Sequence, residues 1–267
     1  MSEKMRRLRA ATPHVAPEDV PDRVYLSKND KTGISVNTSI IESCRPTPAC
    51  SIYCYGLEGR IAMPAALRRQ AENAAVFALE NLGQLADEAM DVTHVVARQQ
   101  SFLRMFGVGD LQPGSLYFIN QLSAYAKAMK PAFRIWVSTR KFDLAEKLVA
   151  NTNLHVMLSF DASTPPRWLA AGRALLAARR PQFFAAWVRT VDGPSAKVPR
   201  WVDIVFEQHR GGAGRAPRPP HAKACPATVH ETHPDAVELT GACANCQFCF
   251  DADRRTAGPA LTHLRRR

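Results

Sequence analysis

Long apolar runs are missing from this sequence of 267 residues. A membrane-spanning helix needs about 20 consecutive apolar residues, and the apolar stretches here are short and interrupted by Arg, Glu or Pro. The N-terminal residues are basic and have no apolar core of the kind that secretory signals contain. We therefore expect a cytoplasmic protein that has no membrane partner.

The signatures of several common enzyme classes are also missing. The chain contains no GxxxxGKS or GxxxxGKT, no GxSxG and no HExxH. These are the minimal motifs of phosphate-binding loops, of serine hydrolases with a nucleophile elbow and of zinc proteases. We expect the protein to belong to none of these three classes.

Apolar residues make up 46% of the chain, which is enough for a hydrophobic core. Helical spacing of apolar residues predicts one or two helices over 64–100, and further helices at 116–129, 141–151 and 166–180. Compact apolar runs predict strands at 101–108, 133–139, 154–160, 182–191 and 201–209. This alternation predicts an α/β fold, a partial (β/α) barrel of parallel strands with helices outside.

The character of the sequence changes near residue 210. The following residues are rich in Gly, Pro and basic side chains and show no periodicity, which is typical of a linker. We expect a basic N-terminal arm over 1–30 and the partial barrel over 31–210. A linker, a cysteine-rich segment and a basic tail would fill 211–267.

Basic residues outnumber acidic ones, 35 Lys and Arg against 24 Asp and Glu, which gives a formal net charge of +11. Such an excess favours contact with polyanions such as nucleic acid. Much of it lies in the two tails, however. Two interpretations therefore stay open, solubilising termini or a nucleic-acid footprint.

The seven cysteines form two groups, with none between residues 55 and 224. The groups are Cys44, Cys50 and Cys54, and Cys225, Cys243, Cys246 and Cys249. In a reducing compartment, clustered cysteines are more often metal ligands than disulfides. Three plus four also fits two metal centres better than it fits any disulfide pairing.

The two groups predict different centres. The C-terminal group is a lone Cys225 followed by CxxCxxC, and four thiolates suit a 4Fe–4S cluster or, alternatively, zinc. We expect Phe248 and Phe250 to pack over the metal there. The N-terminal group has three cysteines, and a cluster held by three thiolates leaves one iron open for chemistry. The alternative is a zinc site completed by His94, His155 or a carboxylate.

Three segments resemble a known family. They are KTGISVNTSIIESCRPTPACSIYCY, RMFGVGDLQPGSLYFINQLSAYAKAMKPAFRIWVSTRK, and CPAT with CANCQFC. In this order they resemble the gene product 88 family of phage and plasmid proteins, over most of residues 31–250. The family name implies no known reaction.

The first cysteine group also resembles the cluster loop of radical S-adenosylmethionine enzymes, although its spacing is CxxxxxCxxxC in place of CxxxCxxC. The GVGD turn at 107–110 resembles that superfamily's Gly-Gly-Glu motif, and LHVMLSFDAS resembles its strand ending in Ser-x-Asp. This resemblance implies two 4Fe–4S clusters and an S-adenosylmethionine site. That site would use Tyr55, Gly107, Gly109, Asp110, Ser138, Arg140, Ser159 and Asp161.

The polar residues at the predicted strand ends also fit purely structural roles. GVGD can be only a strand-to-helix turn, Asp161 can cap the next helix, and Arg140 can be a solvated first-turn residue. We expect an iron–sulfur protein with an unidentified substrate and, if it is redox active, an electron donor. The alternative is a non-catalytic, metal-stabilised nucleic-acid-binding protein of phage or plasmid origin.

Overall fold

The computed structural model describes residues 3–29, 32–57, 59–189, 198–207, 223–224, 243 and 247–253. Cys225 and Cys246, which we predict to bind metal, lie outside the described residues, as does most of the predicted linker. The side chain of Tyr55 is likewise not described.

Helices and strands alternate along the chain. The helices are α1 (Glu3–Ala11), α2 (Ile40–Ser43), α3 (Pro48–Tyr53), α4 (Pro64–Leu79), α5 (Leu82–Ala97), α6 (Pro113–Met129), α7 (Phe142–Ala145) and α8 (Pro166–Arg179), with short 3-10 helices η1 (Pro17–Asp19), η2 (Tyr55–Leu57) and η3 (Gly59–Ala62). The strands are β1 (Leu26–Asn29), β2 (Gly33–Val36), β3 (Phe102–Met105), β4 (Arg134–Thr139), β5 (Leu154–Asp161), β6 (Phe183–Arg189), β7 (Ile204–Glu207) and β8 (Lys223–Ala224).

One sheet contains these strands in the order β1 to β8. The first two strands form an antiparallel pair, and every later neighbour is parallel. The predicted parallel sheet with flanking helices is therefore confirmed. In the described ranges the sheet is open, with β1 and β8 at its two edges, and its order of strands does not by itself confirm a partial barrel.

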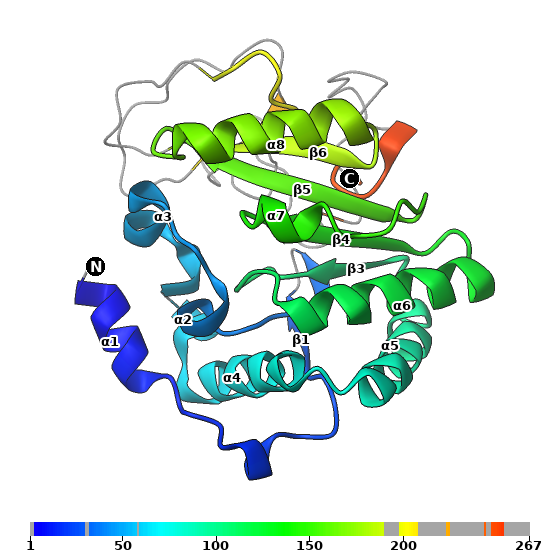
Figure 1. The fold of residues 1–267 in the computed structure, drawn as a ribbon. Helices are drawn as coiled ribbons and strands as arrows, with labels where there is room; N and C mark the ends of the chain where they lie inside the picture. Colours follow the sequence, from blue (N-terminus) through cyan, green and yellow to red (C-terminus); the bar gives the residue numbers. More distant parts are fainter. Residues whose placement is uncertain are drawn as a thin grey trace, which may run out of the picture.

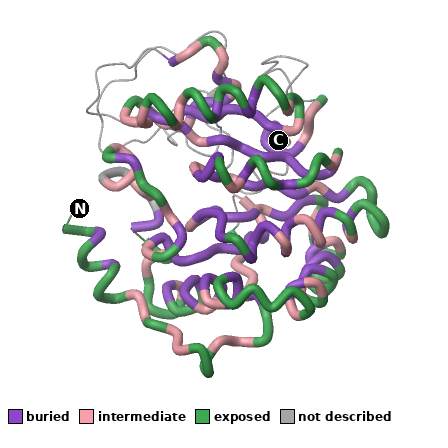
Figure 2. The backbone as a smooth tube through the Cα atoms, in the orientation of Figure 1, coloured by how far each residue is buried: buried purple, intermediate pink, exposed green. Residues whose placement is uncertain are grey.

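The main core lies between the sheet and helices α4 to α8, which pack on the same face (Figure 1). Alternate residues of the central strands point into it, for example Leu103 and Met105 from β3 and Val156 and Leu158 from β5. The central strands are buried along most of their length (Figure 2). This alternation is the period of two that β-strands impose on side chains.

The opposite face of the sheet, which we call the second face, has a separate apolar cluster. It contains Phe102, Trp136, Met157, Phe184, Ala186 and Ile204, together with Phe248, Cys249 and Phe250 from the C-terminal segment. Phe250 stacks on Phe102 with ring centroids 4.2 Å apart, and Phe248 meets Phe184 edge to face. The sequence predicts that these two phenylalanines cover a metal, but their described ring contacts are with the sheet.

Helix α7 is shorter than the helix predicted over 141–151. It ends at Ala145, and Glu146 and Lys147 only continue it as a turn. Farther on, the backbone N–H of Val149 donates to Asn120 Oδ1 of α6 at 3.1 Å. In a longer helix the Val149 N–H would donate to a carbonyl oxygen of that helix. Here it donates to the Asn120 side chain of α6.

Candidate functional site

The residues between β2 and α4, which we call the cysteine loop, follow the carboxyl end of β2. Cys44 directly follows α2, Cys50 lies within α3 and Cys54 directly follows α3. Helix α3 starts where it does because the Thr47 hydroxyl accepts a hydrogen bond from the Cys50 N–H at 3.1 Å and Pro48 fills the first helical position. None of the five described cysteines forms a disulfide with another described cysteine.

Asp161, at the end of β5, holds this loop against the sheet. Its Oδ2 accepts a hydrogen bond from the Thr47 hydroxyl at 2.5 Å, and its Oδ1 accepts from both the N–H and the hydroxyl of Ser163 at 2.8 Å. Ser163 Oγ in turn accepts from the Ala49 N–H at 3.0 Å. The Asp161 carboxylate is thereby linked to the first turn of α3 in two ways, through Thr47 and through Ser163.

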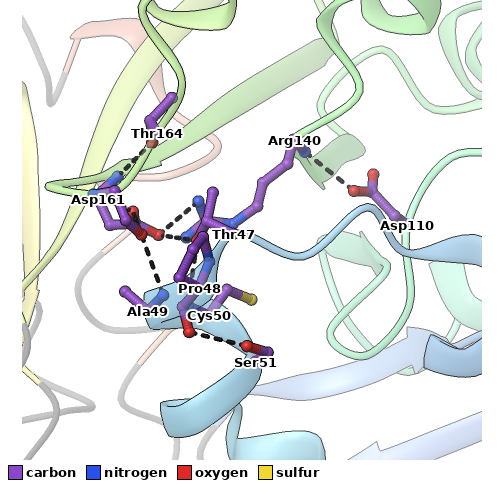
Figure 3. A network of polar contacts seen from close by, with 10 residues as sticks. Thr47, Pro48, Ala49, Cys50, Ser51, Asp110, Arg140, Asp161 and Thr164 are labelled. Atoms are coloured by element: carbon purple, nitrogen blue, oxygen red, sulfur yellow. Dashed lines mark hydrogen bonds and ion pairs between the residues drawn. The ribbon is translucent and has the colours of Figure 1, made fainter. Parts of the chain in front are cut away.

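Arg140 connects the end of β4 to the same carboxylate. Its Nη1 lies 2.8 Å from Asp161 Oδ2, and the two side chains are only 11% and 1% exposed. Figure 3 shows the Arg140 side chain extending toward Asp161 and Thr47 while its backbone N–H points to Asp110. The sequence also allowed Arg140 to be a solvated first-turn residue. The buried ion pair with Asp161 rules out that interpretation.

Asp110 is buried where β3 meets α6. Its carboxylate accepts hydrogen bonds from the Thr139 hydroxyl, the Leu111 N–H and the Arg140 N–H. Its own N–H donates to Ser43 Oγ at 2.9 Å. Burial raises the pKa of Asp110, and the three hydrogen bonds counteract that rise. Asp110 thus joins the ends of β3 and β4 to the cysteine loop.

The three thiols of the loop lie close enough to change one another's acidity. A hydrogen bond from Cys54 is the main cause that lowers the pKa of Cys50 to about 7, and the positive charge of Arg140 acts in the same direction. The pKa of Cys54 is raised by that shared hydrogen bond and by burial. Burial and the charge of Asp110 raise the pKa of Cys44. Cys50 is therefore the most acidic thiol of the group, and a substantial fraction of it is thiolate at neutral pH.

Lys141 is a residue of this region that the sequence did not single out. Its ammonium group is buried and donates to the carbonyl oxygen of Leu111 at 2.6 Å. Burial lowers the pKa of Lys141, while the charge of Asp110 opposes that change. One arginine and one lysine side chain thus follow β4 and lie among the carboxylates and thiols.

Residues of the cysteine loop lie very close to the two glycines of the GVGD turn. Gly109 has a φ of +86°, and a Cβ atom there would lie 2.1 Å from Thr38 Oγ1 and 2.5 Å from the Thr38 carbonyl oxygen. A Cβ at Gly107 would lie 2.9 Å from Asn37 Oδ1. The cysteine loop therefore packs directly on this turn, and a ligand role for the two glycines stays a prediction.

The other predicted site residues have different positions. Ser138 and Ser159 are half-buried near the carboxyl ends of their strands, and in the described part of the chain their side chains join none of these contacts. His155 lies near the amino end of β5 and His94 is exposed on α5, away from the cysteines at the other end of the sheet. Their roles as ligands stay predictions.

Thr47 and Ser163 are functional candidates that sequence reasoning missed. The Thr-Pro pair at 47–48 is a helix-start signal that could have placed α3. Nothing in the sequence indicates that Thr47 bonds to Asp161, because the two residues are far apart in the chain and meet only in the fold.

Helix α1 covers one side of the cysteine loop. Its Met5 and Leu8 are buried in a small cluster with Ile40, Leu57, Leu67 and Val108, against which Cys44 and Cys54 also pack. The segment that the sequence predicts to be a basic N-terminal arm thus includes a helix that belongs to the site.

The described C-terminal cysteines lie elsewhere. Cys243 and Cys249 pack with the apolar cluster on the second face of the sheet. Within the residues that the structure describes, no three Cys, His, Asp or Glu side chains form a group that could hold a metal ion. None of the described helices combines the length and apolar character needed to cross a membrane.

Comparison with known proteins gives one match. The family model described as Gene product 88 matches residues 7–252. No curated protein and no solved structure is significantly similar to the chain. The match spans the cysteine loop, the strand ends that hold it and the described C-terminal cysteines, and the chain therefore belongs to the gene product 88 family.

Proposed function

We propose that this chain is a cytoplasmic iron–sulfur protein that resembles radical S-adenosylmethionine enzymes, with a 4Fe–4S cluster in the cysteine loop and a second one at the C-terminal cysteines. The observation that carries this proposal is the convergence of Cys44, Cys50 and Cys54 at the carboxyl ends of parallel strands. In parallel α/β folds, ligand and active sites lie at that end of the sheet. The proposal includes a partial (β/α) barrel, for which the sequential order of the parallel strands is the support.

The donor chemistry of the loop fits such a cluster. Cluster ligands are thiolates, and Cys50 already has a pKa of about 7. Burial and negative neighbours raise the pKa values of Cys44 and Cys54, and a bound cationic centre favours the deprotonated form of such groups. A cluster binds each thiolate through a different iron, so it needs three thiols that are grouped but not gathered around one point.

The surrounding residues have separate tasks in this proposal. Thr47 and Asp161 fix α3, and with it Cys50, against the end of β5. Arg140 balances the charge of Asp161 and places a cation near the thiolate. Met5 and Leu8 of α1 keep water from one side of the loop. When bound, the cluster would supply single electrons and an open iron for a ligand such as S-adenosylmethionine.

Anaerobic reconstitution with iron and sulfide tests the proposal. We expect a brown protein with about eight irons per chain, and about four in Cys50→Ala, because each cubane cluster holds four irons. Ser51→Ala is the matched control, since Ser51 is the next residue and its hydroxyl donates to the Pro48 carbonyl oxygen within the same helix. A colourless protein with stoichiometric zinc would contradict the proposal.

Spectroscopy separates the parts of the proposal. Mössbauer and EPR spectra recorded with and without S-adenosylmethionine report whether the open iron takes it as a ligand. We expect the spectrum of the cysteine-loop cluster to change on addition and that of the C-terminal cluster to stay the same. Unchanged spectra in a protein that holds both clusters would contradict S-adenosylmethionine binding and leave the iron–sulfur proposal standing.

A further inference from the structure

A basic surface lies over the small apolar cluster beside the cysteine loop. It consists of α1, η3 and the first turns of α4, whose apolar residues form or flank that cluster. These segments expose Lys4, Arg6, Arg7, Arg9, Arg60, Arg68 and Arg69. Figure 1 places α1 next to α2 and the cysteine loop. The basic surface therefore adjoins the candidate site.

The acidic residues in the described parts of these segments are Glu3 and Glu72, and both are already paired. Glu3 pairs with Arg7, and Glu72 pairs with Arg68 at 2.9 Å. In the described part of the chain, Arg6, Arg9 and Arg60 have no ion-pair partner. Three guanidinium groups are thus available to a ligand, and guanidinium suits phosphate because it donates two parallel hydrogen bonds.

The apolar side of α1 is already occupied, which decides between two kinds of anionic partner. A basic helix that binds a membrane inserts a free apolar face into the lipid. In α1 the apolar residues are Met5 and Leu8, which are 8% and 6% exposed and pack on the protein itself. A lipid surface would find only charged residues and alanines on this helix.

A protein partner also fits poorly. The centres of protein interfaces are rich in aromatic and large apolar side chains and poor in charge. The exposed positions of α1 carry only Glu, Lys, Arg and Ala. Between η3 and α4 the surface also exposes Met63, at 56%, but the basic side chains of the described segments far outnumber it. A surface with this excess of positive charge suits a partner that offers a row of phosphates.

We propose that the basic surface formed by α1, η3 and the start of α4 binds the phosphate backbone of a nucleic acid. Lys4, Arg6, Arg7 and Arg9, which the sequence assigns to a basic tail, are part of a folded surface beside the cysteine loop. Binding at this surface does not require a cluster; if the proposed iron–sulfur function holds, the nucleic acid is the substrate class of that site.

Fluorescence anisotropy with labelled 20-nucleotide and 20-base-pair DNA, over a range of salt concentrations, tests this proposal. The surface variant is Arg6→Gln/Arg9→Gln/Arg60→Gln. The control variant, Lys127→Gln/Lys147→Gln/Arg173→Gln, loses the same number of positive charges from exposed residues on or next to α6, α7 and α8. The surface variant should lose roughly tenfold or more in affinity, and its salt slope should fall by about two to three, because each phosphate contact contributes about 0.9 to the slope.

The control variant should bind DNA nearly as tightly as the unaltered protein. Equal weakening of both variants would overturn the proposal, since it would show only an effect of net charge. Binding to vesicles of anionic lipid but not to DNA would overturn it as well. Circular dichroism and iron content are measured on each variant, so that loss of fold or of the cluster is distinguished from loss of the basic surface.

Discussion

At the scale of single residues, Thr47 has two roles that depend on one hydroxyl group. It donates to Asp161 and accepts from the Cys50 N–H, and it is 2% exposed. Its neighbour Pro48 fills the first helical position, and the Ala49 N–H reaches Asp161 only indirectly, through Ser163. The position of Cys50 thus depends on a residue that is not itself a candidate ligand.

Thr47→Val keeps the shape of the side chain and removes both hydrogen bonds. We expect the free energy of unfolding to fall by about 1–3 kcal/mol, because a helix cap is lost and the buried Asp161 carboxylate loses a donor. Urea denaturation measures this change. Ser51→Ala, which removes an exposed hydroxyl of the same helix, should change stability by less than about 0.5 kcal/mol.

The acidity of Cys50 gives a pH-dependent prediction for the metal-free protein. Because the pKa of Cys50 is lowered to about 7, its alkylation by iodoacetamide should rise with pH and reach half its maximum near pH 7. Burial raises the pKa of Cys44, so its alkylation should stay slow well above that pH. Mass spectrometry of the labelled peptides distinguishes the two thiols.

Arg140→Gln tests the cause of that acidity. Removing a positive charge disfavours the thiolate, so the pKa of Cys50 should rise and the alkylation midpoint should move to higher pH. Arg45→Gln removes an arginine that pairs with the exposed Asp143 and should leave the midpoint where it was. A midpoint that moves down in Arg140→Gln would contradict this account.

At the scale of elements, the turn between β3 and α6 and the start of the cysteine loop are built against each other. The Thr38 N–H donates to the Val108 carbonyl oxygen, and the Val108 N–H donates to Asn37 Oδ1. Gly109 completes this contact because only glycine fits both its φ and the space beside Thr38.

Gly109→Ala should therefore lower the free energy of unfolding by more than the strain of a positive φ alone would. We expect a loss of about 3 kcal/mol or more, since backbone strain adds to an overlap with Thr38. Gly59→Ala is the matched control, because Gly59 also has a positive φ, +69°, but no atom lies within 4 Å of the added Cβ. Its cost should be about 1 kcal/mol. Thermal unfolding of the two variants would contradict this reasoning if their losses were equal.

At the scale of the whole molecule, the sheet is covered by helices on one face and by a short C-terminal segment on the other. That segment covers an apolar surface that includes Trp136, which is 2% exposed. An apolar sheet face must be packed against another layer to be stable in water. Among the described residues, Phe248, Cys249 and Phe250 of the C-terminal segment contribute to this layer on the second face.

Phe250→Ala tests this cover. We expect a loss of about 3 kcal/mol or more from the missing stack on Phe102, and a red shift of Trp136 fluorescence as water reaches the second face. Because the chain has four tryptophans, the Trp136 emission is obtained by subtracting the spectrum of Phe250→Ala/Trp136→Phe from that of Phe250→Ala. Met129→Ala, at a position that is 44% exposed, should change neither quantity.

Much of the fold follows from sequence patterns, and less of the site does. Helical spacing over 64–100 and the apolar runs of β3 to β7 are local signals, which is why the sequence predicts the parallel sheet. The roles of Asp161 and Thr47 depend on a contact between distant parts of the chain. The packing of Phe250 on Phe102 does too, and a single sequence contains no local signal for either contact. The same holds for α1, whose Arg residues suggest a tail although Met5 and Leu8 already have helical spacing.

The packing of residues 247–250 on the second face has a consequence for synthesis of the chain. Translation delivers strands β2 to β7 well before these residues, so a chain still attached to the ribosome can complete the helix face while Phe102 and Phe184 lack their contacts with Phe250 and Phe248. Chaperones bind such apolar surfaces on nascent chains. The second face therefore closes only after residues 247–250 have left the ribosome, and a message truncated shortly before codon 247 should yield a product that aggregates or is degraded.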